Sequence, residues 1–358
     1  MNCKSVLRIE NLGVTAMEKE ELKRYNRQII LSEIGLEGQQ RLKSARVLVI
    51  GAGGLGCPVL QYLVAAGVGT LGIVDNDVVD ESNLHRQILY TMADKGLLKA
   101  EVAAKKLEAL NPYVNLFAFP VRLTAENADE LFSQFDFVVD GSDNFETRYL
   151  INDVCVKLGK PFVFGSIFGF EGQVSVFNYQ GGPTYRCVFP EPGDAPNCEI
   201  NGVLGVLPGI VGSYMANEAL KLILQIGTPL SGRLLVTNVL DNSFNLFRVS
   251  RVAHPEAIIS ATTKTSAPKK NNQLSLDILE GLLESNPNSI YLVDVREPNE
   301  FEAENLGGIN IPLSEIADEI PHFPLDKKII FYCQSGRRSK LAFDILKQSA
   351  FKGEAAWV

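Results

Sequence analysis

A short apolar run that ends in a cluster of glycines constrains this chain more than any other feature of its sequence. Residues 46–50 read RVLVI, and the glycine-rich stretch Gly51–Gly56, which reads GAGGLG, follows directly. A β-branched run of this length is typical of a buried parallel strand. The small and apolar residues of 58–66 then predict a helix, and a second strand at 71–74 runs into Asp75. This order predicts the βαβ unit of a doubly wound, Rossmann-like α/β sheet.

Further elements of the same kind follow along the chain. The apolar residues of Lys99–Leu110 recur on one helical face, and Asn111-Pro112 ends that helix. Upstream, the residues from Glu18 to about Gln40 also have a helical pattern. The stretch Gly181–Leu207 is rich in glycine and proline, and it predicts a long connecting loop of the kind that is usually functional or mobile. Short strands are predicted at 137–139, 162–164 and 173–179.

The composition changes after Val252, which indicates a second domain. Residues 254–272 are mostly small and polar and predict a linker. A new α/β pattern then begins, with a helix at about 274–283 and strands at 289–293 and 328–332. We therefore expect an N-terminal extension at 1–17, a first domain at 18–253, a linker at 254–272 and a second, smaller α/β domain at 273–358.

Charge and hydropathy argue against two classes of partner. The net charge of −8 disfavours nucleic acid, because phosphate binding favours a basic face. The most apolar stretch, 209–226, is interrupted by Glu218 and Lys221 and is not expected to span a membrane. Residues 1–16 lack the apolar core of a signal peptide. We therefore expect a cytoplasmic protein whose six cysteines stay reduced.

The glycine-rich turn predicts a phosphate-binding loop. Glycines allow the backbone to approach a phosphate that lies at the N-terminus of the following helix. Asp75, with Asp77 beside it, stands where a Rossmann-type site binds a ribose hydroxyl. Many nucleotide-binding proteins share this pattern, and dehydrogenases are the commonest of them. The candidate loop residues are Gly51, Gly53, Gly54 and Gly56.

Charged residues beyond this loop favour chemistry on a triphosphate. Asn83 and Arg86 follow the ribose position, and Lys99 opens the next predicted helix. A hydride-transfer enzyme has little use for two cations here, whereas transfer of part of a triphosphate requires them to stabilise negative charge. Asp140 and Asp143 follow a predicted strand at the edge where such sheets bind ligands, and a carboxylate there can hold Mg²⁺.

Each of these side chains also has a plainer interpretation. Arg86 could form a surface ion pair, and Lys99 could be a solvated residue of the first helical turn. Asp143 could be the N-cap of a helix. Because all three side chains occur together at these spacings, we consider three separate structural roles less plausible than one shared site.

Together these motifs resemble the MoeB/ThiF family, the bacterial relatives of ubiquitin-activating enzymes. The resemblance extends from about Glu18 to Val252. It rests on residues 24–28 (RYNRQ), 51–56, 75–77, 82–87 (SNLHRQ), Lys99 and 142–144 (SDN). It implies that a ubiquitin-like sulfur carrier protein ending in Gly-Gly is the substrate. The carrier's C-terminal carboxylate would attack the α-phosphate of ATP, giving an acyl-adenylate and pyrophosphate.

The resemblance also implies a role for each side chain. It assigns the ribose to Asp75, with Asp77 beside it, and Mg²⁺ to Asp143, which makes Asp143 a candidate catalytic residue together with Arg86 and Lys99. Arg27 matches the arginine that reaches into the site of the neighbouring subunit, which implies a homodimer. The phosphates of ATP are assigned to Gly54, Asn83, Arg86 and Lys99.

Two cysteines of the first domain fall at family positions. Many members hold a structural zinc with two Cys-x-x-Cys pairs, but Cys187 alone matches that pattern here. A tetrahedral sulfur site needs four ligands, so we expect no zinc. Cys198 matches a loop cysteine that takes part in acyl or sulfur transfer in family members, and the alternative is an ordinary loop thiol.

The second domain contains a cysteine in a distinctive turn. Cys333 follows a predicted strand and precedes a helix, in residues 332–339 (YCQSGRRS). Backbone N–H groups and the positive helix end surround a sulfur in such a turn, and Arg337 and Arg338 add charge. This environment stabilises a persulfide or an oxyanion. A buried structural cysteine would not explain Gly336 and the paired arginines.

With residues 293–297 (VDVRE) and 307–312 (GGINIP), this segment resembles a rhodanese-like domain. By that resemblance Cys333 carries the persulfide sulfur, and Asp294 and Arg296 help to build the site. Dual-specificity phosphatases share the layout, but their loop is usually longer and closes on arginine. Compared with the family, the last strand after Ala350 is expected to be shortened or lost.

The two domains together predict a sequence of two reactions. The first makes an electrophile on the carrier, and the second supplies sulfur that a donor such as a cysteine desulfurase provides. The product would be a carrier thiocarboxylate for molybdenum cofactor synthesis, thiamine synthesis or tRNA thiolation. Two alternatives remain open, namely a dehydrogenase with a fused regulatory domain and a non-catalytic scaffold that binds the carrier.

Overall fold

The structure is a computed structural model, and it forms two compact units that divide between Thr263 and Lys264. It describes residues 17–190, 202–252, 272, 274, 276–285, 289–333, 336–349 and 351–358. Cys198 and most of the predicted linker lie outside these residues. Each unit is described by itself.

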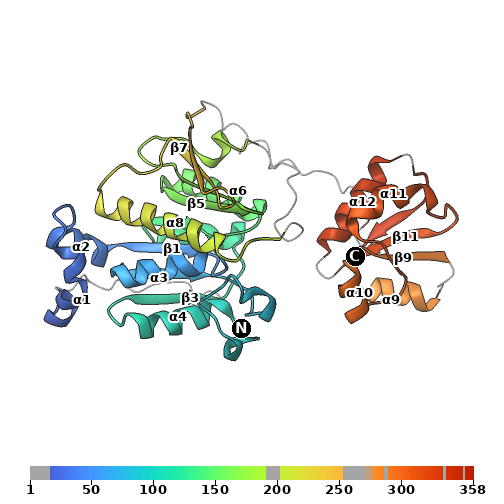
Figure 1. Cartoon of the computed structure of the whole chain (residues 1–358), viewed down its shortest axis with the longest axis horizontal. Coiled ribbons are helices and arrows are strands. Elements are labelled where there is room, and N and C mark those ends of the chain that lie inside the picture. The colour runs from blue at the N-terminus through green and yellow to red at the C-terminus, as the bar shows by residue number, and fades with distance from the viewer. Residues whose placement is uncertain are drawn as a thin grey trace. The chain divides into compact units, whose positions relative to one another are not determined.

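The larger unit is built on one eight-stranded sheet with the order β3-β2-β1-β4-β5-β6-β7-β8 (Figure 1). Its parallel strands are β1 (Arg46–Ile50), β2 (Thr70–Val74), β3 (Asn115–Phe119), β4 (Phe137–Asp140) and β5 (Phe162–Phe168). Three strands continue the sheet antiparallel: β6 (Glu171–Phe177), β7 (Arg233–Asn238) and β8 (Ser243–Arg248). The strand order reverses between β1 and β4, which creates the crevice where doubly wound sheets bind nucleotides.

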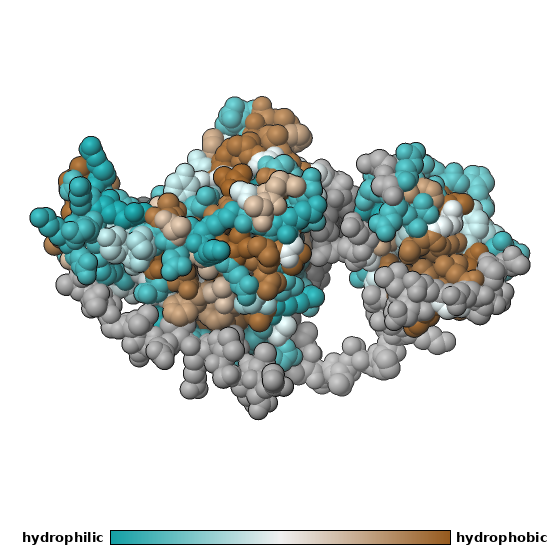
Figure 2. All heavy atoms as spheres, turned by 90° about the horizontal axis from the view of Figure 1, so that it is seen from below, coloured by the Kyte–Doolittle hydropathy of each residue, from teal (hydrophilic) through white to brown (hydrophobic). Residues whose placement is uncertain are grey.

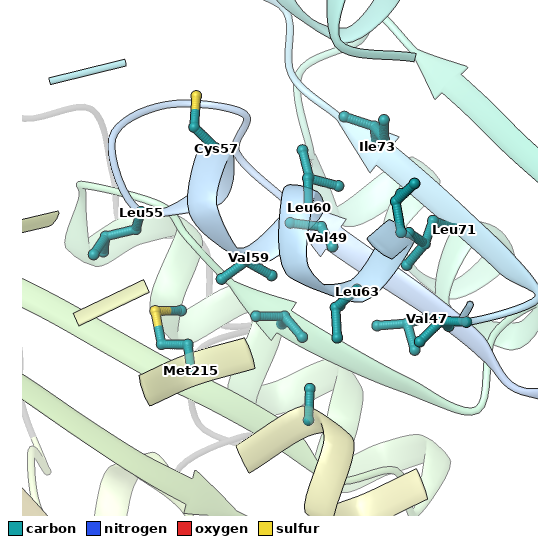
Figure 3. Close-up of a cluster of buried hydrophobic side chains, with 14 of the residues drawn as sticks. Val47, Val49, Leu55, Cys57, Val59, Leu60, Leu63, Leu71, Ile73 and Met215 are labelled. Atoms are coloured by element: carbon teal, nitrogen blue, oxygen red, sulfur yellow. The ribbon is translucent and has the colours of Figure 1, made fainter. Parts of the chain in front are cut away.

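Helices cover both faces of this sheet. Alternating residues of β1 point to opposite faces, so Val47 and Val49 join one core cluster and Leu48 joins the other. Figure 3 shows the first cluster, in which α3 packs its apolar side chains against β1 and β2, with Met215 of α8 beside it. On this face lie α3 (Gly56–Ala66), α4 (Lys99–Leu110) and α8 (Leu207–Leu224). On the other lie α5 (Ala125–Ser133) and α6 (Phe145–Leu158).

The N-terminal helical pattern forms two helices. A helical pattern was predicted from Glu18 to about Gln40, and the structure has α1 (Lys19–Ile29) and α2 (Gly35–Ser44) there, with a turn between them. Gly35 adopts a φ of 59°, which a glycine reaches without strain. The turn lets Gln28 and Gln39 both donate hydrogen bonds to the carbonyl of Ala66, at 3.1 and 2.9 Å. These contacts fix both helices at the C-terminal end of α3.

The smaller unit has a four-stranded parallel sheet with the order β10-β9-β11-β12. Its strands are β9 (Ile290–Asp294), β10 (Ile309–Asn310), β11 (Lys328–Tyr332) and β12 (Ala355–Trp357). Its helices are α9 (Leu276–Ser285), α10 (Pro298–Ala303), α11 (Ile316–Glu319) and α12 (Arg337–Gln348). The last strand, expected to be shortened or lost, is present with three residues and pairs with β11.

Short 3₁₀ turns lie at Glu81–Asn83, Met92–Asp94, Tyr185–Cys187, Leu313–Glu315 and Ile320–His322. Within the described residues, none of the helices combines the length and apolar character needed to cross a membrane. The prediction of a Rossmann-like sheet accompanied by a smaller α/β domain is confirmed.

Candidate active sites

The glycine-rich loop is a tight connection between β1 and α3. Gly51 has a φ of 87°, and a Cβ atom at Gly56 would lie only 1.9 Å from the carbonyl oxygen of Gly51. A Cβ atom at Gly51 would likewise lie 2.7 Å from the carbonyl oxygen of Gly141, at the end of β4. The loop is therefore pressed against its own backbone. The Cys57 N–H of α3 already donates to the Gly53 carbonyl at 2.9 Å, so the N–H groups that remain for a ligand are those of Gly53, Gly54 and Leu55, which have no backbone acceptor among the described residues.

We expect Gly56→Ala to lower the stability of the larger unit. A methyl group 1.9 Å from a backbone oxygen cannot be accommodated without moving the loop. Overpacking of this kind costs up to about 3 kcal/mol, or roughly 6–12 °C in Tm for a unit of this size. Calorimetry measures the shift. Gly209→Ala is the matched control, because a Cβ atom at Gly209 in α8 meets no atom within 4 Å. Equal melting temperatures for the two variants would contradict this prediction.

Asp75 holds the loop in place from the end of β2. Its Oδ2 accepts a hydrogen bond from the Ala52 N–H at 2.7 Å, and its Oδ1 accepts one from the Asp77 N–H at 2.9 Å. Burial raises the pKa of Asp75 against the opposing effect of these bonds and of Lys99. The carboxylate that was predicted to bind ribose therefore also fixes the phosphate loop.

Lys99 is buried rather than solvated. Its side chain is only 6% exposed, and its Nζ lies 3.0 Å from Oδ2 of Asp77. The interpretation of Lys99 as a solvated helix residue is therefore wrong. Its ammonium group is held near the loop by a carboxylate that is itself largely in solvent.

Arg86 lies beside the glycine loop. Its Cγ would be 3.8 Å from a Cβ atom at Gly54. Its guanidinium donates to Oδ1 of Asn83 at 2.6 Å and to the carbonyl of Ser82 at 3.3 Å. Among the described residues it has no carboxylate partner, so the surface ion-pair interpretation is not supported. Asn83 orients a cation whose charge stays available to a phosphate.

Asp140 and Asp143 differ sharply in environment. Asp140 is buried at the end of β4, where its Oδ1 accepts from the N–H and hydroxyl of Ser142. Its Oδ2 finds no hydrogen-bond partner in the described part of the chain, and burial raises its pKa. Asp143 is exposed, and the N-cap of α6 is Asn144, whose Oδ1 accepts from the Thr147 N–H at 2.9 Å. The interpretation of Asp143 as an N-cap is therefore wrong.

An exposed carboxylate at this edge fits Mg²⁺. Mg²⁺ is usually held by one or two carboxylates together with substrate phosphates, and it needs no cage of protein ligands. Asp143 is the residue that would hold the ion.

Three further side chains of this site were not predicted individually. Gln87 is buried with its Oε1 unpaired among the described residues, and its Nε2 would lie 3.4 Å from a Cβ atom at Gly53. The Tyr90 hydroxyl donates to the Ala52 carbonyl at 2.8 Å. Arg148, one turn into α6, donates to the Ser142 carbonyl at 3.1 Å. Gln87 ends the quoted motif 82–87, which was a usable signal, whereas Tyr90 and Arg148 required the fold.

Cys187 does not lie in a metal site formed by described residues. Its sulfur accepts hydrogen bonds from the N–H groups of Thr184 and Val252, both at 3.4 Å. Burial opposes ionisation of this thiol, but the hydrogen bond with the Thr184 hydroxyl, the two N–H bonds and the nearby Arg251 outweigh it and lower the pKa of Cys187. The described residues do not fit a four-ligand zinc site.

Arg27 lies far from the glycine loop of its own chain. It lines a surface cavity of about 290 Å³ with Tyr62 and Ala65 of α3 and with Leu220 of α8. Tyr62 and Ala65 lie in the C-terminal half of α3. The loop is at the opposite end. An α3 of 11 residues has a rise of about 16 Å. The structure therefore does not bring Arg27 together with the other predicted nucleotide-binding residues.

Cys333 occupies the turn between β11 and α12. Its sulfur lies 3.4 Å from the N–H and 3.5 Å from the hydroxyl of Ser339, in the first turn of α12. Gly336 precedes the helix with a φ of 76°, and this turns the chain sharply behind the sulfur. The helix N-terminus therefore points at the sulfur, as predicted. The side chain of Arg337 lies outside the described part of the structure.

Two arginines near this turn are each paired with a carboxylate. Arg296 forks onto the fully buried Asp294, with an Nη2–Oδ2 distance of 2.6 Å. Arg338 forks onto Glu300 of α10, with Nη1–Oε2 at 2.6 Å and Nη2–Oε1 at 2.7 Å. Asp294, Arg296 and Arg338 were predicted as site residues, whereas Glu300 was not.

Comparison with known proteins agrees with this geometry. The ThiF family matches residues 25–257, and the rhodanese-like domain matches residues 275–357. A "probable adenylyltransferase/sulfurtransferase MoeZ" of Mycobacterium tuberculosis is 42% identical over 357 residues, covering 94% of this chain and 91% of that protein. A "sulfur carrier protein adenylyltransferase" of Thermus thermophilus is 59% identical over 241 residues, covering 65% of this chain and 89% of that protein.

Other relatives extend the comparison. "Adenylyltransferase and sulfurtransferase MOCS3" of Anopheles gambiae is 41% identical, covering 85% of this chain and 75% of that protein. The crystal structure of E. coli MccB with ATP superposes with a TM-score of 0.57 at 20% identity, covering 64% of this chain and 72% of that one, which supports the fold. The chain therefore belongs to the ThiF family and is an adenylyltransferase that also carries a rhodanese-like sulfurtransferase domain.

Proposed function

We propose that this enzyme adenylates the C-terminal Gly-Gly of a ubiquitin-like sulfur carrier protein and then converts the adenylate to a thiocarboxylate. The observation that supports the first step best is Arg86, a cation without a carboxylate partner among the described residues, beside a phosphate-binding loop. The carrier carboxylate attacks the α-phosphate of ATP, the bond to the β-phosphate breaks, and pyrophosphate leaves. Arg86 and Lys99 stabilise the negative charge on the phosphates during this transfer.

Other residues would bind and orient ATP. The ribose lies against Asp75, with Asp77 holding Lys99, and Asn83 holds Arg86 toward the phosphates. Mg²⁺ at Asp143 would neutralise charge on the phosphates when bound.

The second step takes sulfur from a persulfide on Cys333. The terminal sulfur attacks the acyl carbon of the adenylate, AMP leaves, and an acyl disulfide to Cys333 forms. Attack by a second thiolate on the sulfur of Cys333 then releases the thiocarboxylate and leaves a disulfide. Cys198, which lies outside the described residues, is the candidate for that thiol. These steps need reduced thiols, so we place the reaction in the cytoplasm.

An apolar surface suits the folded part of the carrier. The larger unit exposes apolar side chains (Figure 2), including Phe168 and Phe170 at the tip of the β5–β6 hairpin. Gly169 there pairs with Val203, so the exposed Leu204 and Val206 continue the surface toward α8. Pro208 in the first turn of α8 then lies against the glycine loop, 3.1 Å from a Cβ atom at Gly54. A carrier bound on this surface would have its C-terminal tail beside the phosphate site.

We infer that the active form is a homodimer in which Arg27 acts on the nucleotide of the other subunit. The support is its distance from its own loop, because α3 separates the two. Tyr62, which lines the same cavity as Arg27, is exposed, and so are Ile30, Leu31 and Leu36 of the segment that follows α1. A second copy would cover them.

Mixing two inactive variants tests this arrangement. We expect Arg27→Ala and Arg86→Ala each to be inactive, and their co-expressed mixture to regain about a quarter of wild-type activity. Half of the randomly formed dimers pair the two variants, and each such dimer has one complete site. ATP–pyrophosphate exchange measures the recovery. If Arg27 acted within its own chain, the mixture would stay as inactive as either variant alone.

The central experiment is ATP–pyrophosphate exchange with Mg²⁺ and carrier proteins ending in Gly-Gly, followed by mass spectrometry of the carrier. Exchange that requires the carrier, and a carrier mass in which sulfur replaces oxygen, would support both steps. Carriers of molybdenum cofactor synthesis, thiamine synthesis and tRNA thiolation are tested in parallel, with a cysteine desulfurase as donor. NADH turnover without exchange would instead favour a dehydrogenase, and carrier binding without either reaction would favour a scaffold.

A further inference from the structure

We propose that Glu300 determines which sulfur donors load Cys333, by holding Arg338 in an ion pair that withholds its charge from small anionic donors. This inference rests on the sulfurtransferase role of Cys333. It concerns a residue that touches an arginine of the turn and lies on a different element, α10.

The position of Arg338 makes it the natural partner for an anionic donor. It is the residue before Ser339, whose N–H lies 3.4 Å from the Cys333 sulfur, in the first turn of α12. Glu300 raises the pKa of Arg338, and the charge of Cys333 adds to this effect. Arg338 and the thiol therefore share one electrostatic environment. An unpaired guanidinium in this place would attract a donor that carries negative charge.

Arg338 is fully engaged by Glu300. Both of its terminal nitrogens donate to the carboxylate, at 2.6 and 2.7 Å, and the side chains are only 24% and 30% exposed. A parallel two-bond pair of this kind is among the strongest ion pairs, and partial burial reduces its screening by salt. Loading by an anion at Arg338 would require this pair to open.

The second described arginine near the turn is neutralised as well. Arg296 is forked onto Asp294, which is completely buried, and also donates to the Glu304 carbonyl. The two described guanidinium groups are therefore matched by two carboxylates. Such a site suits a persulfide delivered on a thiol better than a doubly charged small anion.

Both kinds of donor load the thiolate by the same displacement. With thiosulfate, the Cys333 thiolate attacks the outer sulfur, the S–S bond breaks, and sulfite leaves with the bonding electrons. With a thiol persulfide, the leaving group is the donor's thiolate. The two donors differ mainly in the charge of the group that must be accommodated, and this is the property that Glu300 would control.

The fold permits a clean substitution at Glu300. Its Oε2 also accepts a hydrogen bond from the Glu297 N–H at 3.0 Å, as the N3 residue of a capping box that begins α10. Glutamine serves in this box as well as glutamate does. Glu300→Gln therefore removes the charge and keeps the cap. Glu302→Gln, at an exposed position of the same helix, is the matched charge control.

The test measures kcat/KM for loading Cys333 in the full chain with two donors, thiosulfate and the persulfide of cysteine. We expect Glu300→Gln to raise kcat/KM for thiosulfate roughly tenfold, because the guanidinium of Arg338 becomes available as a charged hydrogen-bond donor. The kcat/KM for the persulfide of cysteine should change less than about threefold. Glu302→Gln should leave the ratio unchanged. The double variant Glu300→Gln/Arg338→Gln should lose the gain.

The outcomes separate this role from a merely structural one. If Glu300 only braced the fold, its substitution would lower both values together with Tm. A parallel change for both donors, no change, or a gain that persists without Arg338 would overturn the proposal. Absence of any persulfide on Cys333 in the unmodified protein, with every donor, would instead refute the sulfurtransferase role on which it rests.

Discussion

Arg86→Ala should reduce carrier-dependent ATP–pyrophosphate exchange by about 10²- to 10³-fold, the usual loss when one positioned donor is removed from a charge-stabilising site. The expectation follows from a guanidinium that lies beside the phosphate loop and has no carboxylate partner among the described residues. Asn83 and the Ser82 carbonyl hold it there, so it needs no reorganisation when ATP binds. The loss should fall on kcat more than on KM, because the charge develops during transfer.

Two companion variants make the measurement specific. Arg86→Lys keeps the charge and loses the fork, so we expect partial activity. Lys105→Ala removes an exposed cation from α4 and serves as the control for net charge. Melting temperatures near that of the wild type should accompany all three changes. Exchange that survives in Arg86→Ala at close to the wild-type rate would exclude Arg86 from the chemistry.

Cys333→Ser should abolish thiocarboxylate formation, with a loss above roughly 10³-fold, while leaving ATP–pyrophosphate exchange intact. A serine hydroxyl cannot carry sulfane sulfur, and its oxygen is a far weaker nucleophile than a thiolate. The fold should tolerate the change because Cys333 is half-buried at the end of β11 and, among the described residues, its sulfur makes hydrogen bonds only with Ser339. Mass spectrometry of the carrier and exchange measured on the same preparation separate the two steps.

The control is another thiol of the same protein. Cys187→Ser replaces a half-buried thiol of the larger unit. Its sulfur accepts hydrogen bonds from the N–H groups of Thr184 and Val252. We expect this variant to retain persulfide loading and thiocarboxylate formation. Thiocarboxylate produced at the normal rate by Cys333→Ser would mean that sulfur reaches the adenylate without this turn.

Four strands of the parallel half of the large sheet, β1, β2, β4 and β5, were predictable because each contains an apolar run that ends at a glycine or an acidic residue. The strands β3, β7 and β8 were not predicted, and β3 and β8 have few buried residues. Every residue of β8 after Ser243 is exposed, so its sequence shows neither an apolar run nor alternation. At β3 the chain lies at the sheet edge and only Phe119 is buried. A strand that is held mainly by backbone hydrogen bonds to its neighbour has no apolar pattern by which its sequence could predict it.

The candidate sites show the same division. The residues of the glycine loop and the Cys333 turn could be predicted because each motif is local in sequence. The burial of Lys99 could not, since it depends on Asp77, which is 22 residues away. The pairing of Arg338 with Glu300 joins residues 38 apart on different helices. Sequence motifs identify the charged groups, and the fold decides which of them are neutralised.

The two bonds of Asp75 limit how this enzyme can evolve. One carboxylate oxygen fastens the backbone of the phosphate loop at Ala52, and the other fastens the turn at Asp77. A substitution that changed the preference for one sugar over another would therefore also displace the phosphates. Selection cannot adjust the two properties separately at this position. A change in nucleotide preference would therefore have to begin with substitutions at other residues of the site.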